Sequence, residues 1–164
     1  MTDVRGGPRS WRASRTVMTQ LVFPEHANAL GKAFGGQIMA WSDMCAGICS
    51  MRHAGSSTVT ASVDELHFDK PVAIGDTVIL EARVNGTFRT SLEVEVVVDG
   101  ENPRTGARWR CVEARMTFVA IDDAGRPRPV ASLVLDDDDA RERQVAAEAR
   151  RQERLARRKT AARA

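Results

Sequence analysis

The spacing of apolar residues divides the chain into two regions. From Gln37 to about His53, apolar residues follow one another without a proline over a stretch too long for one strand, so we expect a helix. After Ser57 and as far as about Ile121, apolar residues recur at every second position and β-branched residues are frequent, which predicts strands. A helix followed by a run of strands predicts an α+β fold.

The strand pattern also predicts turns and faces. A first strand is expected at Thr16–Phe23, before the helix. In the later region the apolar face changes phase near Asp64 and Glu65, as a β-bulge would cause. Asn85-Gly86 has the chemistry of a tight turn between two strands. The residues expected to face inward on those two strands are Val78, Leu80, Ala82, Val84, Leu92, Val94, Val96 and Val98.

The predicted helix is apolar on nearly all sides, which is typical of a helix buried inside a protein. One of its stripes differs, because it consists of small residues and a single carboxylate. The stripe comprises Gly36, Ala40, Asp43, Gly47 and Ser50. Small side chains three and four residues apart let another element approach closely. We therefore expect close packing along this stripe.

The length of 164 residues fits one folded domain. Residues 1–15 are polar and without periodicity, which predicts a flexible start, and residues 16–135 form the predicted domain. Residues 136–164 consist mainly of Asp, Glu, Arg and Ala, with only Val145 and Leu155 as sizeable apolar residues. We expect this Arg-rich tail to be solvated, helical or disordered, and dispensable for activity.

Composition narrows the possible partners and the setting. A formal net charge of +2 gives no global field of one sign, so nucleic acid is not an implied partner. No apolar run reaches the ~20 residues that span a bilayer, and the start of the chain lacks the pattern of a secretory signal, so we expect a cytoplasmic protein with no membrane partner. Cys45, Cys49 and Cys111 are expected to be reduced and buried. No metal-ligand or phosphate-loop motif is found in the sequence.

Several short sequence blocks carry a family resemblance. In chain order they are Asn28-Ala29-Leu30-Gly31, Phe34-Gly35-Gly36, Trp41-Ser42-Asp43, Arg52-His53, Thr60-Ala61-Ser62-Val63-Asp64, Phe68 with Pro71-Val72, Gly75-Asp76, Arg89-Thr90-Ser91 and Thr117-Phe118-Val119-Ala120. Together, over roughly Val17 to Leu133, they resemble the acyl-CoA hydrolase branch of the hotdog fold, in which a curved antiparallel sheet wraps a long central helix. This branch includes small bacterial acyl-CoA thioesterases and the mammalian cytosolic acyl-CoA hydrolase. Phe88 departs from the pattern, because the family usually has glycine there.

Thioester hydrolysis needs a positioned water, a base and donors for the developing oxyanion. Taken alone, Asp43 could equally be a structural carboxylate; the resemblance implies that it is catalytic, as a general base or else as a nucleophile that forms an anhydride. Gly35 and Gly36 would offer unsatisfied amides at the helix start, with Gly36 N–H as the leading donor, or would only allow tight packing. Asn28 could be a simple turn residue; the resemblance implies that it orients the water or the thioester carbonyl.

The resemblance also implies where the substrate lies and how subunits assemble. Arg89, Thr90 and Ser91 look like the segment that contacts coenzyme A, although an Arg at the start of a strand is usually only solvated. Ala61, Ser62 and Val63 look like the strand beside pantetheine. Coenzyme A is then part of the substrate, and no separate cofactor is expected. The assembly implied is a homodimer, in which Asn28 of one subunit faces Asp43 of the other, within a hexamer built as a trimer of dimers.

Three alternatives to hydrolysis remain at this point. A hotdog hydratase or dehydratase usually needs a His with an acid, and no His lies near Asp43 in the sequence. A non-enzymatic acyl-CoA sensor would keep the binding groove without turnover. Nucleic-acid binding could use the basic tail. Its cations are Arg150, Arg151, Arg154, Arg157, Arg158 and Lys159, but acidic residues interleave or precede them and stacking aromatic residues are absent from the tail.

Overall fold

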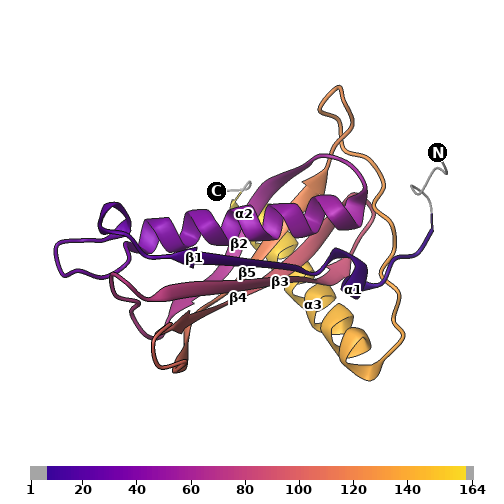
Figure 1. The fold of residues 1–164 in the computed structure, drawn as a ribbon. Helices are drawn as coiled ribbons and strands as arrows, with labels where there is room; N and C mark the ends of the chain where they lie inside the picture. The colour runs from indigo at the N-terminus through magenta and orange to yellow at the C-terminus, as the bar shows by residue number, and fades with distance from the viewer. Residues whose placement is uncertain (1–6, 162–164) are drawn as a thin grey trace.

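A computed structural model describes residues 7–161 as a five-stranded antiparallel sheet between two long helices. The strands are β1 (Thr16–Leu21), β2 (Thr58–Phe68), β3 (Thr77–Thr87), β4 (Ser91–Glu101) and β5 (Arg108–Ala120). Their order in the sheet is β1-β3-β4-β5-β2, so β1 and β2 form its edges. Helix α2 (Gly35–Ala54) lies along one face and helix α3 (Asp138–Ala161) packs against the other (Figure 1). The α+β hotdog architecture predicted from the sequence is confirmed.

The core lies between α2 and the inner face of the sheet. All eight residues predicted to face inward on β3 and β4 are at most 1% exposed. From α2, Ile38, Trp41, Cys45 and Cys49 pack onto them. The short helix α1 (Trp11–Ser14) and the 3₁₀ turn η1 (Pro24–His26) flank β1 at its two ends. No helix within residues 7–161 is both long enough and apolar enough to cross a membrane.

Helix α2 begins two residues before the predicted start and ends at Gly55, which adopts the left-handed conformation with φ 64°. One protomer alone does not bury this helix on all sides. Its outer face is exposed in the protomer, where Met39, Met44 and Met51 are 42%, 53% and 44% exposed. A helix lying on one sheet has nothing beyond it to cover the opposite side. The apolar residues of that side therefore indicate a further packing partner.

Strand β2 is irregular at two places. Its register against β5 shifts between Val63 and Glu65, where the sequence pattern predicts a bulge, and also between Thr60 and Ser62. The second shift was not predicted, because apolar and polar residues alternate without interruption from Val59 through Ala61 to Val63. The bulges bend this edge strand beside α2.

Asn85-Gly86 does not form the predicted turn. Strand β3 continues through both residues to Thr87, with a register shift between Val84 and Gly86, and the turn follows at residues 88–90. Glycine is needed at position 86 for a different reason. A Cβ atom there would lie 2.7 Å from Cβ of Ala147, on helix α3. The glycine thus allows a helix to approach the outer face of the sheet closely.

Helix α3 is not a solvated tail. Ala140 and Ala147 are 1% and 0% exposed against the sheet. In place of apolar side chains, α3 presents arginines to carboxylates of the outer face: Arg143 pairs with Glu95, and Arg150 lies 2.7 Å from Glu93. The expectation failed because it looked for an apolar stripe. This interface is instead formed by small residues and ion pairs.

The buried His53 ties α2 to the start of the chain. His53 is 0% exposed, and its Nδ1 lies 3.1 Å from Oγ of Ser14 in α1. Burial lowers the pKa of His53 from 6.5 to about 4; a hydrogen bond with the backbone of Ala131 opposes this shift, and the charge of Arg9 contributes to it. In the folded protein this imidazole is therefore neutral at ordinary pH.

We expect His53 to make the protein sensitive to acid. The pKa is lower in the folded state, so the unfolded state takes up the proton first, and stability is lost as the pH falls from about 6.5 towards 4. The full loss is on the order of 3 kcal/mol. Urea unfolding between about pH 7 and about pH 5 should give a steeper loss for the wild type than for His53→Gln. Equal slopes for the two proteins would contradict this assignment.

Candidate functional site

Asp43 lies at the middle of α2, on a side of the helix that is exposed in the protomer. Its Oδ1 accepts a hydrogen bond of 2.7 Å from Oγ1 of Thr60 on β2. The pair fixes one carboxylate oxygen and leaves Oδ2 able to accept a proton. Thr60 was not among the predicted site residues, although it directly precedes Ala61 in a block that carries the family resemblance. What identifies Thr60 as a site residue is the direction of its side chain towards α2, which is seen in the structure.

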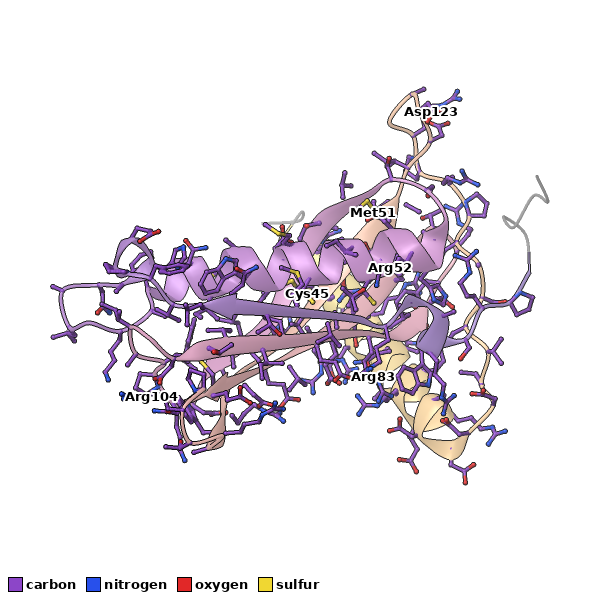
Figure 2. The ribbon with its side chains drawn as sticks, viewed as in Figure 1. Cys45, Met51, Arg52, Arg83, Arg104 and Asp123 are labelled. Atoms are coloured by element: carbon purple, nitrogen blue, oxygen red, sulfur yellow. The ribbon has the colours of Figure 1, made fainter. Side chains whose placement is uncertain are left out.

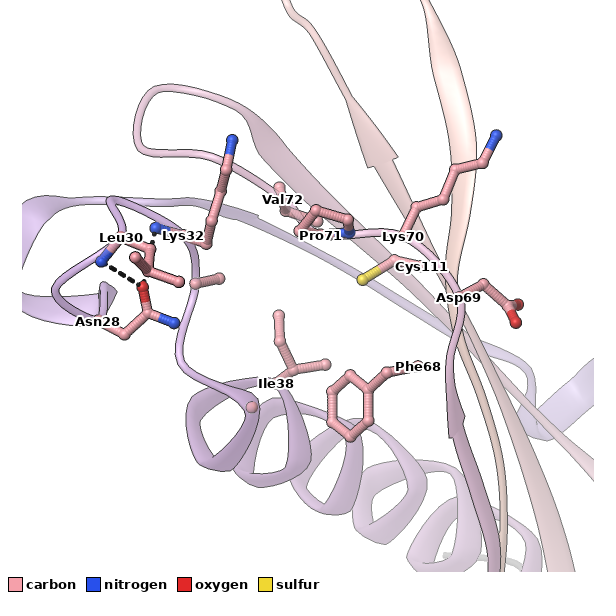
Figure 3. A pocket seen from close by; sticks show the side chains of 12 residues that line it. Asn28, Leu30, Lys32, Ile38, Phe68, Asp69, Lys70, Pro71, Val72 and Cys111 are labelled. Atoms are coloured by element: carbon pink, nitrogen blue, oxygen red, sulfur yellow. Dashed lines mark hydrogen bonds between the residues drawn. The ribbon is translucent and has the colours of Figure 1, made fainter.

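Asn28 lies in the loop that leads into α2. Its Oδ1 accepts hydrogen bonds from the amides of Leu30 at 3.0 Å and Lys32 at 3.3 Å (Figure 3). These bonds are those of a turn residue, and they also fix the orientation of the side-chain amide. The NH₂ group of Asn28 points away from them and can donate to a ligand. The turn role and a role in binding are therefore compatible.

Gly35 and Gly36 form the first turn of α2, after the N-cap residue Phe34. Amides in a first helical turn have no acceptor within the helix. Both glycines also permit close packing: a Cβ at Gly35 would lie 3.3 Å from the ring of Phe68, and one at Gly36 would lie 2.5 Å from the ring of Phe34. The packing role of the two glycines is thus present, and their amides lie where the helix dipole favours negative charge.

A cavity of about 490 Å³ opens beside this helix start. Ile38, Val72, Cys111 and the ring of Phe68 line its interior, and Asn28 stands on the side of the loop (Figure 3). The apolar interior suits a hydrocarbon group better than a polar one. Its volume lies within the range of small-molecule binding sites.

The predicted site residues fall into separate groups within one protomer. Asp43 is eight residues beyond Gly35 and so lies ~12 Å further along the helix axis. It does not line the cavity that contains Asn28. One protomer therefore does not bring Asn28 and Asp43 together.

The segments assigned to coenzyme A lie near the opposite end of α2 from Asn28. Arg89 and Thr90 lie in the turn between β3 and β4, and Ser91 begins β4. The carbonyl of Thr90 accepts a hydrogen bond of 3.0 Å from the amide of Ala120. Ser91 pairs with Val119, which pairs in turn with Val59 at the start of β2. Ala61, Ser62 and Val63 follow on that strand. The two segments thus lie at one end of the sheet, separated by β5.

The cysteines and histidines do not join the candidate site as nucleophiles or bases. Burial raises the pKa of Cys45 to about 11, of Cys49 to about 12 and of Cys111 to about 11. The ring of His26 packs edge-on against Trp41, with the ring centroids 5.0 Å apart. Among the residues that the structure describes, no group of three or more His, Cys, Asp or Glu could hold a metal ion.

Comparison with known proteins agrees with the fold and with the sequence blocks. The family model described as "Thioesterase superfamily" matches residues 30–107. The uncharacterized acyl-CoA thioester hydrolase YkhA of Bacillus subtilis is 40% identical over 126 residues, which cover 77% of this chain and 73% of that protein. This chain belongs to the thioesterase superfamily. The resemblance to its acyl-CoA hydrolase branch is confirmed.

Other members of the thioesterase superfamily differ in length. Acyl-coenzyme A thioesterase 11 of Mus musculus is 37% identical over 134 residues, which cover 82% of this chain but only 23% of the mouse protein, so the chain spans about a quarter of that relative.

Solved structures of acyl-CoA hydrolases have the same fold over nearly the whole chain. An acyl-CoA hydrolase from Staphylococcus aureus, solved with butyryl coenzyme A, coenzyme A and coenzyme A disulfide, has a TM-score of 0.86 at 33% identity, and the match covers 94% of each chain. A hexameric acyl-CoA thioesterase has a TM-score of 0.87 at 38% identity, over 92% of this chain and 97% of its own.

We expect the three thiols to be inert in the folded protein. Cys45 and Cys49 are buried in the core, Cys111 is almost fully covered although it lines the cavity, and the raised pKa values keep all three thiols protonated, whereas the thiolate is the reactive form. A thiol-specific disulfide reagent at about pH 8 should modify almost none of them before unfolding and all of them in guanidinium. Rapid reaction of a thiol in the folded protein would contradict this prediction and show that the structure around that cysteine opens.

Proposed function

We propose that this protein hydrolyses acyl-CoA thioesters to free coenzyme A and a carboxylic acid. The observation that carries the proposal is the hydrogen bond between Thr60 and Asp43, which orients a carboxylate on the exposed face of α2. Membership of the thioesterase superfamily supports it, as do relatives that are named for acyl-CoA hydrolysis. Coenzyme A belongs to the substrate, and the reaction requires no further cofactor.

The S. aureus acyl-CoA hydrolase gives independent support for the choice of residues. It has been solved as single alanine variants at an aspartate, an asparagine and a threonine. Their residue numbers are the same as those of Asp43, Asn28 and Thr60 in this chain. The asparagine variant was solved with coenzyme A. We assign the catalytic constellation of this chain to these three side chains.

In the proposed mechanism Asp43 acts as a general base. Its free Oδ2 takes a proton from water while the water oxygen attacks the thioester carbon, and the carbonyl oxygen becomes negatively charged. When the C–S bond breaks, the proton passes from Asp43 to the departing sulfur of coenzyme A. Thr60 keeps the carboxylate in one orientation throughout. Direct attack by Asp43, through an anhydride, is the alternative route.

The developing oxyanion needs donors, which Asp43 cannot provide. The amide of Gly36, beside that of Gly35, is the proposed donor at the positive end of the α2 dipole. The side-chain NH₂ of Asn28 polarises the carbonyl or orients the water. Because Asn28 and Asp43 are apart in one protomer, we propose that the two come from different subunits.

A two-fold dimer explains the surfaces that one protomer leaves open. Exposed methionines lie along α2 on both sides of Asp43 in the sequence, and β2 is an 11-residue edge strand with Val59 and Val63 46% and 44% exposed. Unpaired edge strands and apolar faces both favour association. The hexameric state of two structural relatives supports a trimer of such dimers as the final assembly.

The proposed substrate lies across the same interface. The cavity beside Gly35 takes the acyl group. Pantetheine follows the backbone of Ala61, Ser62 and Val63, and exposed Arg89, with Thr90 and Ser91, binds phosphate. Nucleic acid is not proposed as a partner, because Arg150 and Arg154 of the tail face the sheet and bind carboxylates.

Asp43→Asn should remove most turnover, because the amide keeps the shape but cannot accept the proton. We expect kcat to fall roughly 10²- to 10⁴-fold in an acyl-CoA hydrolysis assay that follows free thiol. Asp123→Asn, at the tip of the loop after β5 that projects from the body of the protein (Figure 2), is the matched control and should keep wild-type kcat. Near-normal kcat in a correctly folded Asp43→Asn protein would exclude Asp43 as the base.

Sharing of the site between subunits can be tested with hybrid dimers. Asn28→Ala and Asp43→Asn chains, each nearly inactive, are mixed in equal amounts, unfolded and refolded. About half of the dimers are then hybrids, each with one intact site, so roughly a quarter of wild-type activity should return. Differential tags on the two chains verify subunit exchange. Proven hybrids without recovered activity would place both residues in one subunit's site or in separate roles.

A further inference from the structure

Helix α3 contacts the sheet through arginines on one of its faces. Arg143, Arg150 and Arg154 are spaced by seven and four residues, and such spacings place side chains on one side of a helix. Each faces a carboxylate of the sheet, namely Glu95, Glu93 and Asp64 in the same order. The last of these pairs differs from the other two, because Asp64 belongs to β2, the strand that carries Thr60.

Asp64 joins three elements on the outer face of the sheet. Its Oδ1 accepts a hydrogen bond of 3.0 Å from Ser62, on the same strand. Its Oδ2 accepts one of 3.1 Å from Thr117 on β5 and one of 2.6 Å from Arg154 on α3. The side chains of Arg154 and Asp64 are only 15% and 18% exposed. The ion pair is therefore screened less by solvent than a surface pair would be.

The local structure of β2 makes this contact consequential. The register against β5 shifts between Thr60 and Ser62 and again between Val63 and Glu65. The segment from Thr60 to Asp64 thus contains two irregularities in its pairing with β5. A bulge leaves residues without a partner on the neighbouring strand. The position of this segment therefore depends on its side-chain bonds. Thr60 bonds Asp43 on the inner face, and Asp64 bonds Arg154 on the outer face.

Building on the proposed function, we propose that Arg154 is a positioning residue for the reaction. By holding Asp64, it fixes the bulged segment of β2 and so keeps Thr60 in place to orient the carboxylate of Asp43. The contact of Arg154 is with Asp64 and not with Thr60 or Asp43 themselves. Its effect on the reaction passes through the strand, and the misplacement of a catalytic group by about 1 Å can cost on the order of 10²-fold in rate.

The same helix also holds the turn between β3 and β4. The side chain of Gln144 accepts from the amide of Thr87 at 3.0 Å and donates to its carbonyl at 3.3 Å. The guanidinium of Arg151 lies 4.9 Å from the centre of the Phe88 ring. Phe88, which replaces the glycine usual in the family, thus provides a docking point for α3. Helix α3 therefore contacts residues next to both segments to which coenzyme A is assigned, namely Asp64 beside Val63 and Phe88 beside Arg89.

The test compares Arg154→Met with Arg157→Met. Arg157 is one helical turn away in sequence, is 83% exposed and pairs with Glu153 of its own helix, so it is the matched control. We expect Arg154→Met to lower kcat for acyl-CoA about tenfold or more, with a smaller change in KM, and Arg157→Met to retain wild-type kcat. Asp64→Asn should reproduce the loss, and it replaces Arg154→Met if that variant does not fold.

A purely stabilising role is distinguished by combining variants. Thr60→Val removes the bond to Asp43; if Arg154 acts through Thr60, the double variant Thr60→Val with Arg154→Met should keep a kcat within about twofold of Thr60→Val alone. Losses that multiply would overturn the proposal. So would wild-type kcat in both folded Arg154→Met and Asp64→Asn.

A second measurement does not depend on catalysis. Hydrogen exchange of the amides of residues 58–64 should be faster in Arg154→Met than in the wild type or in Arg157→Met. Unchanged exchange in this segment overturns the positioning role, whatever the activity. A wild-type protein that does not hydrolyse any acyl-CoA would instead refute the proposed function, and the exchange data would still decide whether Arg154 holds β2.

Discussion

The packing of α3 on the sheet depends on ion pairs between carboxylates of the outer face and arginines of the helix. Glu93 is fully buried and Glu95 is 5% exposed, so neither can rely on water for its charge. Removal of one partner from a buried ion pair typically destabilises a protein by roughly 3–5 kcal/mol. The close approach that makes these pairs possible requires glycine at position 86, beneath Ala147. Ion pairs thus take the place of apolar contacts between α3 and the sheet.

The two faces of the sheet therefore follow different physical rules. On the inner face, burial of apolar side chains from β3, β4 and α2 forms the core, and exact partners matter less than volume. On the outer face, the buried carboxylates need arginines in suitable orientations: Glu93 pairs with Arg150, and Glu95 pairs with both Arg143 and Arg115. Strand β2 contacts the helices on both faces of the sheet: Thr60 bonds Asp43 of α2 on the inner face, and Asp64 bonds Arg154 of α3 on the outer face. Its bulges let one short segment serve both.

How much the sequence could predict follows from the same distinction. Period-two burial identified the inward residues of β3 and β4, because apolar burial leaves a regular pattern. The docking of α3 was missed, since ion pairs between residues far apart in sequence leave no such pattern. Asn85-Gly86 was misread as a turn, because close helix packing demands glycine as a turn does. Thr60 was missed because its partner Asp43 lies on another element.

The exposed position of Asp43 adds the last constraint on the site. A carboxylate open to bulk water interacts weakly with nearby charges and dipoles, whereas catalysis by positioned dipoles needs a site from which water is largely excluded. Among the residues that the structure describes, the hydrogen bond from Thr60 is the one that restrains Asp43, and the methionines on the same side of α2 are open to solvent. A second subunit placed on this face would bury those methionines and surround the carboxylate at once. Assembly and the formation of a working site are then the same event, which explains why an apolar helix face carries a single charge at its centre.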